Sequence, residues 1–306
     1  MHSIFHVWKE IFEDDGLEPS HLFTLEEKPT RCIKYVRDSV FGIDFDEKSV
    51  RVARTLNLIA GDGQTNILHL NTLDYDRWDE VTSQEEWIDT YSVGFKRFKR
   101  RRVGNDFKNL SFDVLMANPP FAGPIKESRT LSRYELGHKP NGRLETAVGR
   151  DVLFIERNLD FLRPGGRMAI VLPQGRFNNS SDKRIRDFIA ERCRILAVVG
   201  LHPNTFKPHT GTKTSVLFAQ KWNDDPVAGP LCPRKDDYNI FFATQTKPAK
   251  DTSGDKIYLV KDAEYLRDQF SHPVIDQDLY NHDGVNGDGI AEAFIEFATK
   301  EKLSFF

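Results

Sequence analysis

The sequence predicts an α/β fold built on a mostly parallel sheet. Short apolar runs alternate with segments of helical periodicity along most of the chain, which favours parallel strands joined by helices. The last two strands of that series have no helix between them. A parallel crossover needs a connection of helical size, whereas a short connection makes an antiparallel hairpin. We therefore expect the final strand of the sheet to run against the others.

The expected strands are short apolar runs, and several end at Gly, Asn or Asp. They lie at residues 40–44, 66–70, 112–117, 168–172, 195–201 and 214–218, and a further strand at 238–243 is expected in the segment beyond this series. About a dozen residues rich in Pro, Gly and Thr separate 195–201 from 214–218, and they carry no helical signal. These two strands form the expected hairpin.

The expected helices place apolar residues at spacings of three and four. They lie at residues 4–12, 46–59, 152–162 and 290–297, and one more begins at Ser180 or Ser181. Asp46 and either serine are residue types that cap a first helical turn. Gly61-Asp62-Gly63 and Pro164-Gly165-Gly166 are expected to end the second and third of these helices.

Three segments stand apart from this alternation. Residues 75–110 form a charged insertion, and residues 122–150 form a long polar segment of a kind that is more often functional than not. From Asp224 onward the composition turns rich in Pro and Asp. We therefore expect a main domain at residues 1–222 and an appended segment at residues 223–306.

The composition indicates in which compartment the chain is expected and how it could contact nucleic acid. No apolar run approaches the roughly 18 residues that a membrane helix needs, and the first ten residues do not have the character of a secretory signal. Cys32, Cys193 and Cys232 are widely spaced, so neither a disulfide framework nor a metal site is expected, and a reduced cytoplasm fits. The net charge of −3 confines any nucleic-acid contact to local basic patches.

The residues Asn118-Pro119-Pro120-Phe121 directly follow the strand at 112–117, at the edge where open α/β sheets place ligands. An exocyclic aromatic amine is a poor nucleophile because its lone pair is delocalised into the ring. The Asn118 side-chain oxygen and the Pro119 carbonyl can accept its two N–H bonds and localise that lone pair, on a backbone that the prolines stiffen. Phe121 can stack on a base flipped out of a duplex. These four are the candidate catalytic residues.

This motif and its flanks resemble the adenine-specific DNA methyltransferases, most closely the modification subunits of type I restriction–modification enzymes. The resemblance covers roughly residues 40–260 and also rests on residues 42–44, 162–173 and 206–215. It implies a Rossmann-like, S-adenosylmethionine-dependent fold and methyl transfer to the N6 amine of adenine. Residues 1–222 are then a partial methyltransferase catalytic domain.

The resemblance also suggests where S-adenosylmethionine binds. Asp44 matches the acid that binds the ribose hydroxyls, and a carboxylate that accepts two hydroxyl hydrogens suits that task. Asn71-Thr72-Leu73 falls where the family usually has Asp-Thr-Leu or Asp-Ser-Leu, whose Asp binds the adenine amine. Asn71 departs from that pattern, although its side chain still offers a carbonyl acceptor.

One part of the family pattern has no counterpart. The family holds the methionine part of the cofactor on a Gly-rich loop after the first strand, but upstream of Gly42 this chain has only Gly16 and no apolar strand. We expect Met1 to lie just past that loop, so that the first strand and the Gly-rich loop are missing. The chain is then either part of a split enzyme completed by a separate polypeptide or an inactive remnant of a longer gene.

Basic residues cluster at 96–102 and recur in the expected hairpin connection. Both groups are candidates for contact with DNA phosphates, while a solvated loop face stays open for the first group. The candidates are Lys96, Arg97, Lys99, Arg100, Arg101, Arg102, Lys207 and Lys213. The resemblance implies double-stranded DNA as a partner, together with separate specificity and restriction subunits.

Two other functions stay open. RNA adenine and protein glutamine methyltransferases use similar Asn-Pro-Pro chemistry, although Phe rather than Tyr at position 121 and the segment 206–215 favour DNA. A non-catalytic DNA-binding or assembly module would keep the pocket and lack the cofactor. DNA binding without cofactor binding would identify that case.

Overall fold

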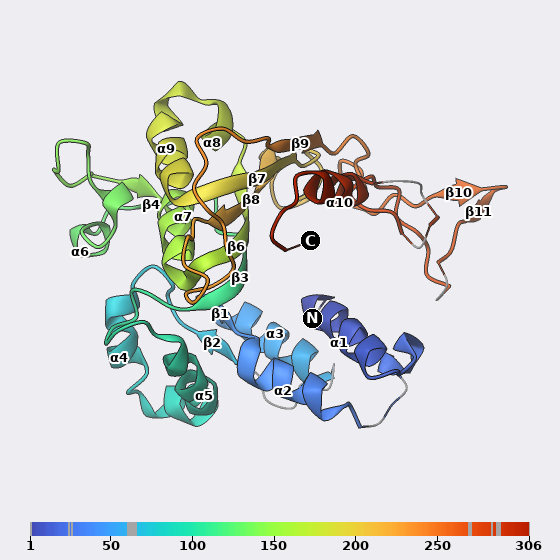
Figure 1. The fold of residues 1–306 in the computed structure, drawn as a ribbon, viewed down its shortest axis with the longest axis horizontal. Coiled ribbons are helices and arrows are strands. Elements are labelled where there is room, and N and C mark those ends of the chain that lie inside the picture. Colours follow the sequence, from blue (N-terminus) through green and yellow to red (C-terminus); the bar gives the residue numbers. More distant parts are fainter. Residues whose placement is uncertain are drawn as a thin grey trace. The chain divides into compact units, whose positions relative to one another are not determined.

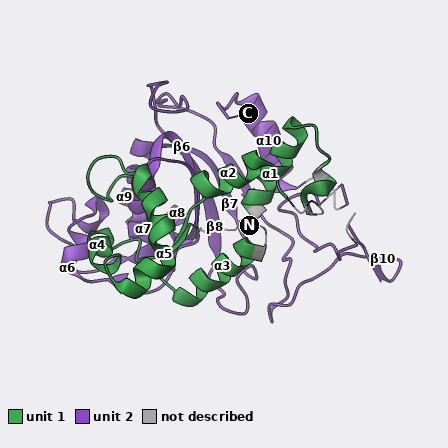
Figure 2. Cartoon of the chain, turned by 90° about the horizontal axis from the view of Figure 1, so that it is seen from below, with its two compact units in different colours: residues 1–110 green, residues 111–306 purple. Residues whose placement is uncertain are grey.

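The computed structural model describes residues 2–23, 25, 27–59, 66–268, 271–282, 284–285 and 289–305. The chain divides into two compact units, residues 1–110 and residues 111–306, which Figure 2 colours separately. This division differs from the expected boundary between residues 222 and 223. The segment after residue 222 adds a strand to the sheet of unit 2 and a helix that packs on that sheet.

Unit 1 is mainly helical and contains one pair of short strands (Figure 1). Its helices are α1 (His2–Asp14), α2 (Thr30–Ser39), α3 (Glu47–Ile59), α4 (Trp78–Val81) and α5 (Glu85–Phe98). The strands β1 (Gly42–Asp44) and β2 (Ile67–His69) pair in parallel, as the strand–helix–strand pattern predicts. The glycines expected to end α3 lie outside the described residues.

The helix predicted at residues 4–12 is confirmed, and it packs against α2, which the sequence pattern did not predict. Trp8 and Phe12 of α1 are buried in one cluster with Cys32 and Val36 of α2. The Trp8 indole also donates a hydrogen bond to the Cys32 carbonyl at 3.1 Å. Basic and polar side chains surround the two buried residues of α2, so its apolar face is too narrow to stand out in the sequence.

The charged insertion at residues 75–110 folds around aromatic rings. Trp87, Tyr91, Phe95 and Phe98 follow one another on α5 at spacings of four, four and three, and all four are buried. The ring centroids of Trp87 and Phe95 are 5.2 Å apart, within the range of favourable aromatic pairs. Charged residues occupy much of the rest of the helix, so the average composition is polar although one face is apolar.

Unit 2 contains a five-stranded sheet in the order β3-β6-β8-β7-β9. These strands are β3 (Phe112–Ala117), β6 (Leu162–Pro173), β7 (Cys193–Gly200), β8 (Thr214–Lys221) and β9 (Phe241–Thr244). β3 pairs with β6 in parallel, and β9 pairs with β7 in parallel, whereas β8 is antiparallel to both of its neighbours. This confirms the predicted mostly parallel sheet with one antiparallel hairpin strand. Contrary to our expectation, the antiparallel strand is not the final one, because β9 follows it in the chain and extends the sheet beyond β7.

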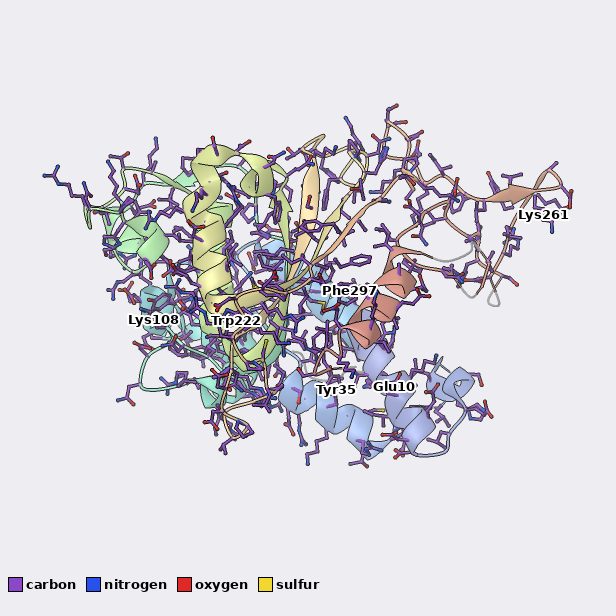
Figure 3. All side chains as sticks on the ribbon, turned by 45° about the horizontal axis from the view of Figure 1, so that its top comes forward. Glu10, Tyr35, Lys108, Trp222, Lys261 and Phe297 are labelled. Atoms are coloured by element: carbon purple, nitrogen blue, oxygen red, sulfur yellow. The ribbon has the colours of Figure 1, made fainter. Side chains whose placement is uncertain are left out.

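Helices cover both sides of this sheet. Figure 1 shows α7 (Arg150–Phe161) and α9 (Lys183–Arg192) on one side and α10 (Ile290–Lys300) on the other. Shorter elements join them: β4 (Pro124–Ile125), α6 (Ser128–Leu131), β5 (Val148–Gly149), α8 (Gly175–Asn178), β10 (Val260–Lys261) and β11 (Glu264–Tyr265). β10 and β11 form an exposed hairpin, with Lys261 near its tip (Figure 3).

Two helix starts were expected at capping residues, with different outcomes. Asp46 precedes α3, and its carboxylate accepts hydrogen bonds from the Ser49 backbone N–H and hydroxyl, at 2.9 and 2.7 Å. These bonds lower the pKa of Asp46. The expected cap at Ser180 or Ser181 is wrong, because residues 180–182 form a short 3₁₀ turn and α9 begins after it, with Asp182 at its N-cap.

The turn expected to end α7 instead lies inside β6. Gly165 takes a positive φ of 71°, and a Cβ there would lie 1.8 Å from the Pro230 carbonyl oxygen. Only glycine meets both conditions without strain. The register between β3 and β6 shifts at this point, so residues 162–166 form an irregular start to a strand that is regular from Arg167.

The C-terminal helix belongs to the core of unit 2. Ala298 of α10 is buried in one cluster with Leu196 of β7, and Phe294 packs against it. The ring centroids of Phe241 on β9 and Phe294 are 5.6 Å apart. Phe297, labelled in Figure 3, lies on the same helix and faces Phe241 at 5.6 Å. The helical spacing of apolar residues at 290–297 predicted α10, but it did not predict which surface of the sheet this helix packs against.

Candidate active site

The Asn-Pro-Pro-Phe motif lies where the sequence predicts, directly after β3. Because β3 and β6 are parallel neighbours, the motif sits at the carboxyl edge of the sheet of unit 2. Asn118 is exposed and Pro119 is buried. Among the described residues, none bonds to the Asn118 side chain or to the Pro119 carbonyl oxygen. Two hydrogen-bond acceptors therefore stand uncommitted at this edge.

An aromatic residue from another part of unit 2 borders the motif. The loop at residues 201–213, between β7 and β8, carries Phe206, and its ring centroid lies 6.0 Å from that of Phe121. The rings meet edge to face, with an interplanar angle of 78°. Both are half-buried, so each still exposes part of its surface. Two aromatic walls at a right angle can receive a flat ring.

Buried charges brace the segment behind the motif. Asp151, at the start of α7, is fully buried and accepts two hydrogen bonds from Arg176 of α8, at 2.7 and 3.1 Å. Arg176 also pairs with Asp182 at 3.2 Å. Burial works against the charge of Arg176, but its two carboxylate partners outweigh that effect and raise its pKa. The chain enters this network from β5, which pairs with β4 just after the motif.

In unit 1, the candidate cofactor residues Asp44 and Asn71 lie together. Asp44 ends β1 and Asn71 follows β2, and the Leu70 N–H donates to the Asp44 carbonyl at 3.0 Å. The Asp44 carboxylate is exposed; one oxygen accepts from the Asp46 N–H at 2.8 Å, and no described residue bonds the other. The Asn71 side-chain oxygen accepts from the Leu73 N–H at 3.1 Å.

These residues differ in how open they are. Asn71 is exposed, Thr72 is half-buried, and Leu73 is buried. A free carboxylate oxygen at Asp44 suits a hydroxyl group. The oxygen of Asn71 keeps one lone pair for an incoming amine, because a carbonyl has two. Asp44 therefore fits the expected ribose contact well, and Asn71 fits the adenine contact with one acceptor already shared.

Two indoles of the insertion hold the end of β2. The Trp78 Nε1–H donates to the Asn71 carbonyl at 2.7 Å, and the Trp87 Nε1–H donates to the His69 carbonyl at 2.9 Å. Sequence reasoning missed both tryptophans as supports for the strand end. Their apolar periodicity within the charged insertion was a signal that could have revealed a packed helical element there.

Comparisons with known proteins show the family of this chain. The sequence profile of the family described as N-6 DNA Methylase matches residues 22–292. The chain belongs to this family. It is 32% identical over 112 residues to the type I restriction enzyme EcoEI methylase subunit of Escherichia coli, which covers 36% of this chain and 21% of that protein. This confirms the resemblance expected from the motif and its flanks.

Other relatives are more distant. The type I restriction enzyme EcoKI methylase subunit of Escherichia coli K12 is 26% identical over 121 residues, covering 39% of this chain and 21% of that protein. The chain thus spans about a fifth of the length of these two relatives. A solved methyltransferase subunit of a type I restriction–modification system from Streptococcus thermophilus superposes with a TM-score of 0.42 at 24% identity, covering 61% of this chain and 34% of that one.

The basic cluster at residues 96–102 is partly committed to the fold. Arg97 donates to the Asn66 side chain at 3.3 Å, and Arg101 donates to the Asp38 carbonyl at 2.5 Å. Arg102 donates to the Asn105 carbonyl, and the Lys99 ammonium lies 4.7 Å from the centre of the Phe95 ring. The structure thus gives these four a structural role that the sequence did not predict.

The remaining basic candidates are more available. Lys96 and Arg100 are exposed, and no described residue pairs with either side chain. They line a surface depression of unit 1 together with Arg37, Arg97 and Arg101. In unit 2, Lys213 is exposed and Lys207 is half-buried beside Phe206.

Over the part of the chain that the structure describes, no three His, Cys, Asp or Glu side chains gather in a way that could hold a metal ion. Within the same residues, no helix has the length and apolar character to cross a membrane.

Proposed function

We propose that this chain is the catalytic part of an adenine-specific DNA methyltransferase of a type I restriction–modification system. The observation that carries the proposal is the motif at the end of β3: two uncommitted acceptors, Asn118 and the Pro119 carbonyl, stand beside the paired rings of Phe121 and Phe206. Acceptors for an amine beside walls for a flat ring suit an aromatic amine as substrate. Family membership supports DNA adenine as the source of that amine.

The chemistry follows from these groups. The two N–H bonds of the adenine amine are donated to the Asn118 oxygen and to the Pro119 carbonyl, which draws the nitrogen toward a tetrahedral geometry. Its lone pair then points away from the ring and toward the electrophile. Pro119 and Pro120 hold the acceptors in place, so little reorganisation is needed during reaction. Phe121 and Phe206 hold the base and exclude water from its faces.

S-adenosylmethionine is the cofactor of this proposal and supplies an electrophilic methyl group when bound. Asp44 would accept hydrogen bonds from the ribose hydroxyls, and Asn71 with Thr72 and Leu73 would border the adenine. The free oxygen of Asp44 and its exposure support that role. Trp78 would act through the backbone of Asn71, which it bonds.

DNA contact is proposed for the basic residues that the fold leaves available. Lys207 and Lys213 lie in the loop that carries Phe206, so they would hold phosphates near the flipped base. Lys96 and Arg100 would hold phosphates on unit 1. Specificity and restriction subunits are the proposed protein partners, and a separate polypeptide would supply the Gly-rich loop if the enzyme is split. The cytoplasm is the proposed location, and the buried free thiols of Cys32, Cys193 and Cys232 suit it.

Calorimetric titration with S-adenosylmethionine and its demethylated product tests the cofactor part of the proposal. We expect binding that Asp44→Asn weakens and that the matched change Asp106→Asn, at an exposed site elsewhere in unit 1, leaves unaltered. If the chain alone binds nothing, the titration is repeated after adding the specificity subunit and any partner that carries a Gly-rich loop. Binding of DNA without cofactor under all these conditions would instead identify a non-catalytic module.

A further inference from the structure

The loop at residues 201–213 carries Phe206 to the motif, yet it contains no helix or strand. An irregular loop needs bonds from elsewhere to keep an aromatic side chain in one place. The structure shows where these bonds come from. A second segment, residues 245–255, follows β9 and contacts the loop with both side-chain and backbone atoms.

Gln245 makes the first attachment. Its side chain is buried, and its oxygen accepts from the His202 N–H at 3.0 Å and from the Thr205 hydroxyl at 3.3 Å. Its amide nitrogen donates to the Lys247 carbonyl at 2.9 Å, which fixes the orientation of the side chain. The Gln245 backbone N–H also donates to the Gly200 carbonyl at 2.8 Å, so the attachment begins where β7 ends.

Lys250 makes the second attachment, on either side of Phe206. Its ammonium donates to the Thr205 carbonyl at 3.1 Å and to the Lys207 carbonyl at 3.3 Å. In the opposite direction, the Asn204 side-chain amide donates a hydrogen bond to the Lys250 carbonyl at 3.0 Å. A charged donor shared by two carbonyls restrains the backbone of the residue between them. Phe206 is that residue.

The turn after Lys250 closes the attachment. The Asp251 carboxylate accepts from the backbone N–H groups of Ser253, Gly254 and Asp255, at 2.9, 2.8 and 2.9 Å. At Gly254, φ is +99° and a Cβ would lie 2.7 Å from the Pro208 nitrogen. The turn therefore lies directly against the loop, and glycine is needed for both the conformation and the approach.

We propose that Lys250 and Gln245 are positioning residues for recognition of the target base: they hold Phe206 at its angle to Phe121. This inference rests on the proposed function and extends it to a segment expected to be an appendage. Lys250 touches neither base nor cofactor in this account, and it acts only through the loop backbone.

Hydrogen exchange on the full chain tests the mechanical part. Lys250→Met keeps the length of the side chain and removes its two bonds, so amides of residues 202–210 should exchange roughly tenfold faster. The matched control is Lys256→Met, since Lys256 is exposed and no described residue pairs with its side chain. β7 and β8 should keep wild-type exchange in both variants. Equal loop exchange in Lys250→Met and wild type would overturn the inference, whatever the DNA results.

Base recognition is then measured with a duplex that carries 2-aminopurine opposite an abasic position, so that the base leaves the stack at low cost. Wild type and Lys256→Met should bind it equally, and Lys250→Met should bind it roughly threefold to tenfold more weakly. Lys250→Arg, which keeps the charged donor, should recover part of the loss. If Lys250 only stabilised the fold, Lys250→Met would lower the stability of the protein, but its folded form would give the same 2-aminopurine signal as wild type.

A double-mutant cycle shows whether Lys250 affects probe binding through Phe206 or independently of it. If Lys250 acts through Phe206, then Lys250→Met should add little to the effect of Phe206→Leu on probe binding. Additive effects would overturn the inference. A wild-type chain whose loop is protected from exchange but which gives no 2-aminopurine response would count against the proposed function, while the exchange data would still show what holds the loop.

Discussion

The two units build their strand ends in different ways. In unit 2, the motif follows a six-residue strand in a five-stranded sheet, and its neighbour β6 has twelve residues. In unit 1, the candidate cofactor residues lie at or just after the ends of strands of three residues each, in a sheet of two strands. Two strands alone are marginal in water, so the ends of β1 and β2 depend on what packs around them.

Aromatic side chains supply that support in unit 1. Trp78 and Trp87 bond the backbone at the end of β2, and their rings pack with Phe95, Phe98 and Phe107. In unit 2, the equivalent support is the sheet itself together with the buried pair of Asp151 and Arg176. A substitution in one kind of support should therefore affect one set of candidate residues and spare the other.

The largest effect is expected at the motif. Asn118→Ala should lower methyl transfer by roughly 10²–10³-fold, because it removes one of the two acceptors that activate the amine. Cofactor affinity should stay near the wild-type value, since the candidate cofactor residues lie in unit 1. Initial rates and calorimetry measure the two quantities. Asn105→Ala is the control, at an exposed asparagine outside the motif, and equal rates in Asn118→Ala and wild type would refute the role of Asn118.

The next effect concerns the stability of unit 2. Asp151→Asn removes the negative charge of a fully buried carboxylate that pairs with Arg176. It should lower the free energy of unfolding by about 3 kcal/mol. Urea unfolding followed by circular dichroism measures this loss. The control is Lys183→Met, which breaks an exposed pair with Asp187 and should change little. An equal effect of both substitutions would contradict the bracing role of the buried pair.

Phe121→Ala tests the aromatic wall. Loss of stacking should weaken binding of the 2-aminopurine duplex by about 1–3 kcal/mol, with no effect on cofactor binding. Phe112→Ala is unsuitable as a control because that ring packs in the core against Phe161. Phe45→Ala is suitable, since Phe45 is 71% exposed in unit 1. If Phe121→Ala bound the probe as tightly as wild type, Phe121 would not contact the flipped base.

Trp78→Phe tests the aromatic support of the strand end in unit 1. It keeps an aromatic ring and removes the hydrogen bond to Asn71, so cofactor affinity should fall by roughly fivefold, or about 1 kcal/mol. Binding of the 2-aminopurine duplex should not change, because the motif belongs to unit 2. A loss of probe binding equal to the loss of cofactor binding would show that the two supports are not independent.

The smallest expected effect concerns the reactivity of two buried thiols, those of Cys193 and Cys232. Burial raises the pKa of Cys193 to about 12 and that of Cys232 to about 11. Both thiols are thus protonated in the folded chain at pH 8, and iodoacetamide should label them slowly until urea unfolds unit 2. Because the folded pKa of Cys193 exceeds its ordinary value of 9.0, its contribution to stability is complete below about pH 9 and is lost as the pH rises toward 12. Rapid labelling of the native chain would contradict this burial.

Local patterns predicted much of unit 2. The strand at 112–117 and its motif are contiguous in sequence, and the short connection between β7 and β8 was enough to predict the antiparallel pair. Contacts between distant segments could not be predicted in this way. Phe206 meets Phe121 across 85 positions, and Lys250 meets Thr205 across 45, so neither pair leaves a periodic signal.

Unit 1 was predicted less completely for a related reason. The aromatic residues of α5 recur at helical spacing, but their charged neighbours masked the pattern. The charge of the basic residues at 96–102 allows either contact with DNA or a solvated face, and several of them bond the fold instead. Charge in a sequence gives the sign of a side chain, and only the structure shows what that side chain contacts.

In the proposed function, the motif directs a methyl group to the N6 amine of adenine in DNA. The most direct test incubates the chain, with its partner subunits where needed, with S-adenosylmethionine and adenine-containing duplex DNA, followed by mass spectrometry of the digested nucleosides. We predict N6-methyldeoxyadenosine from the wild-type chain and none above background from Asn118→Ala. Unmodified DNA together with methylated RNA adenine or protein glutamine would contradict the proposed function, and so would the absence of transfer by a chain that binds both cofactor and DNA.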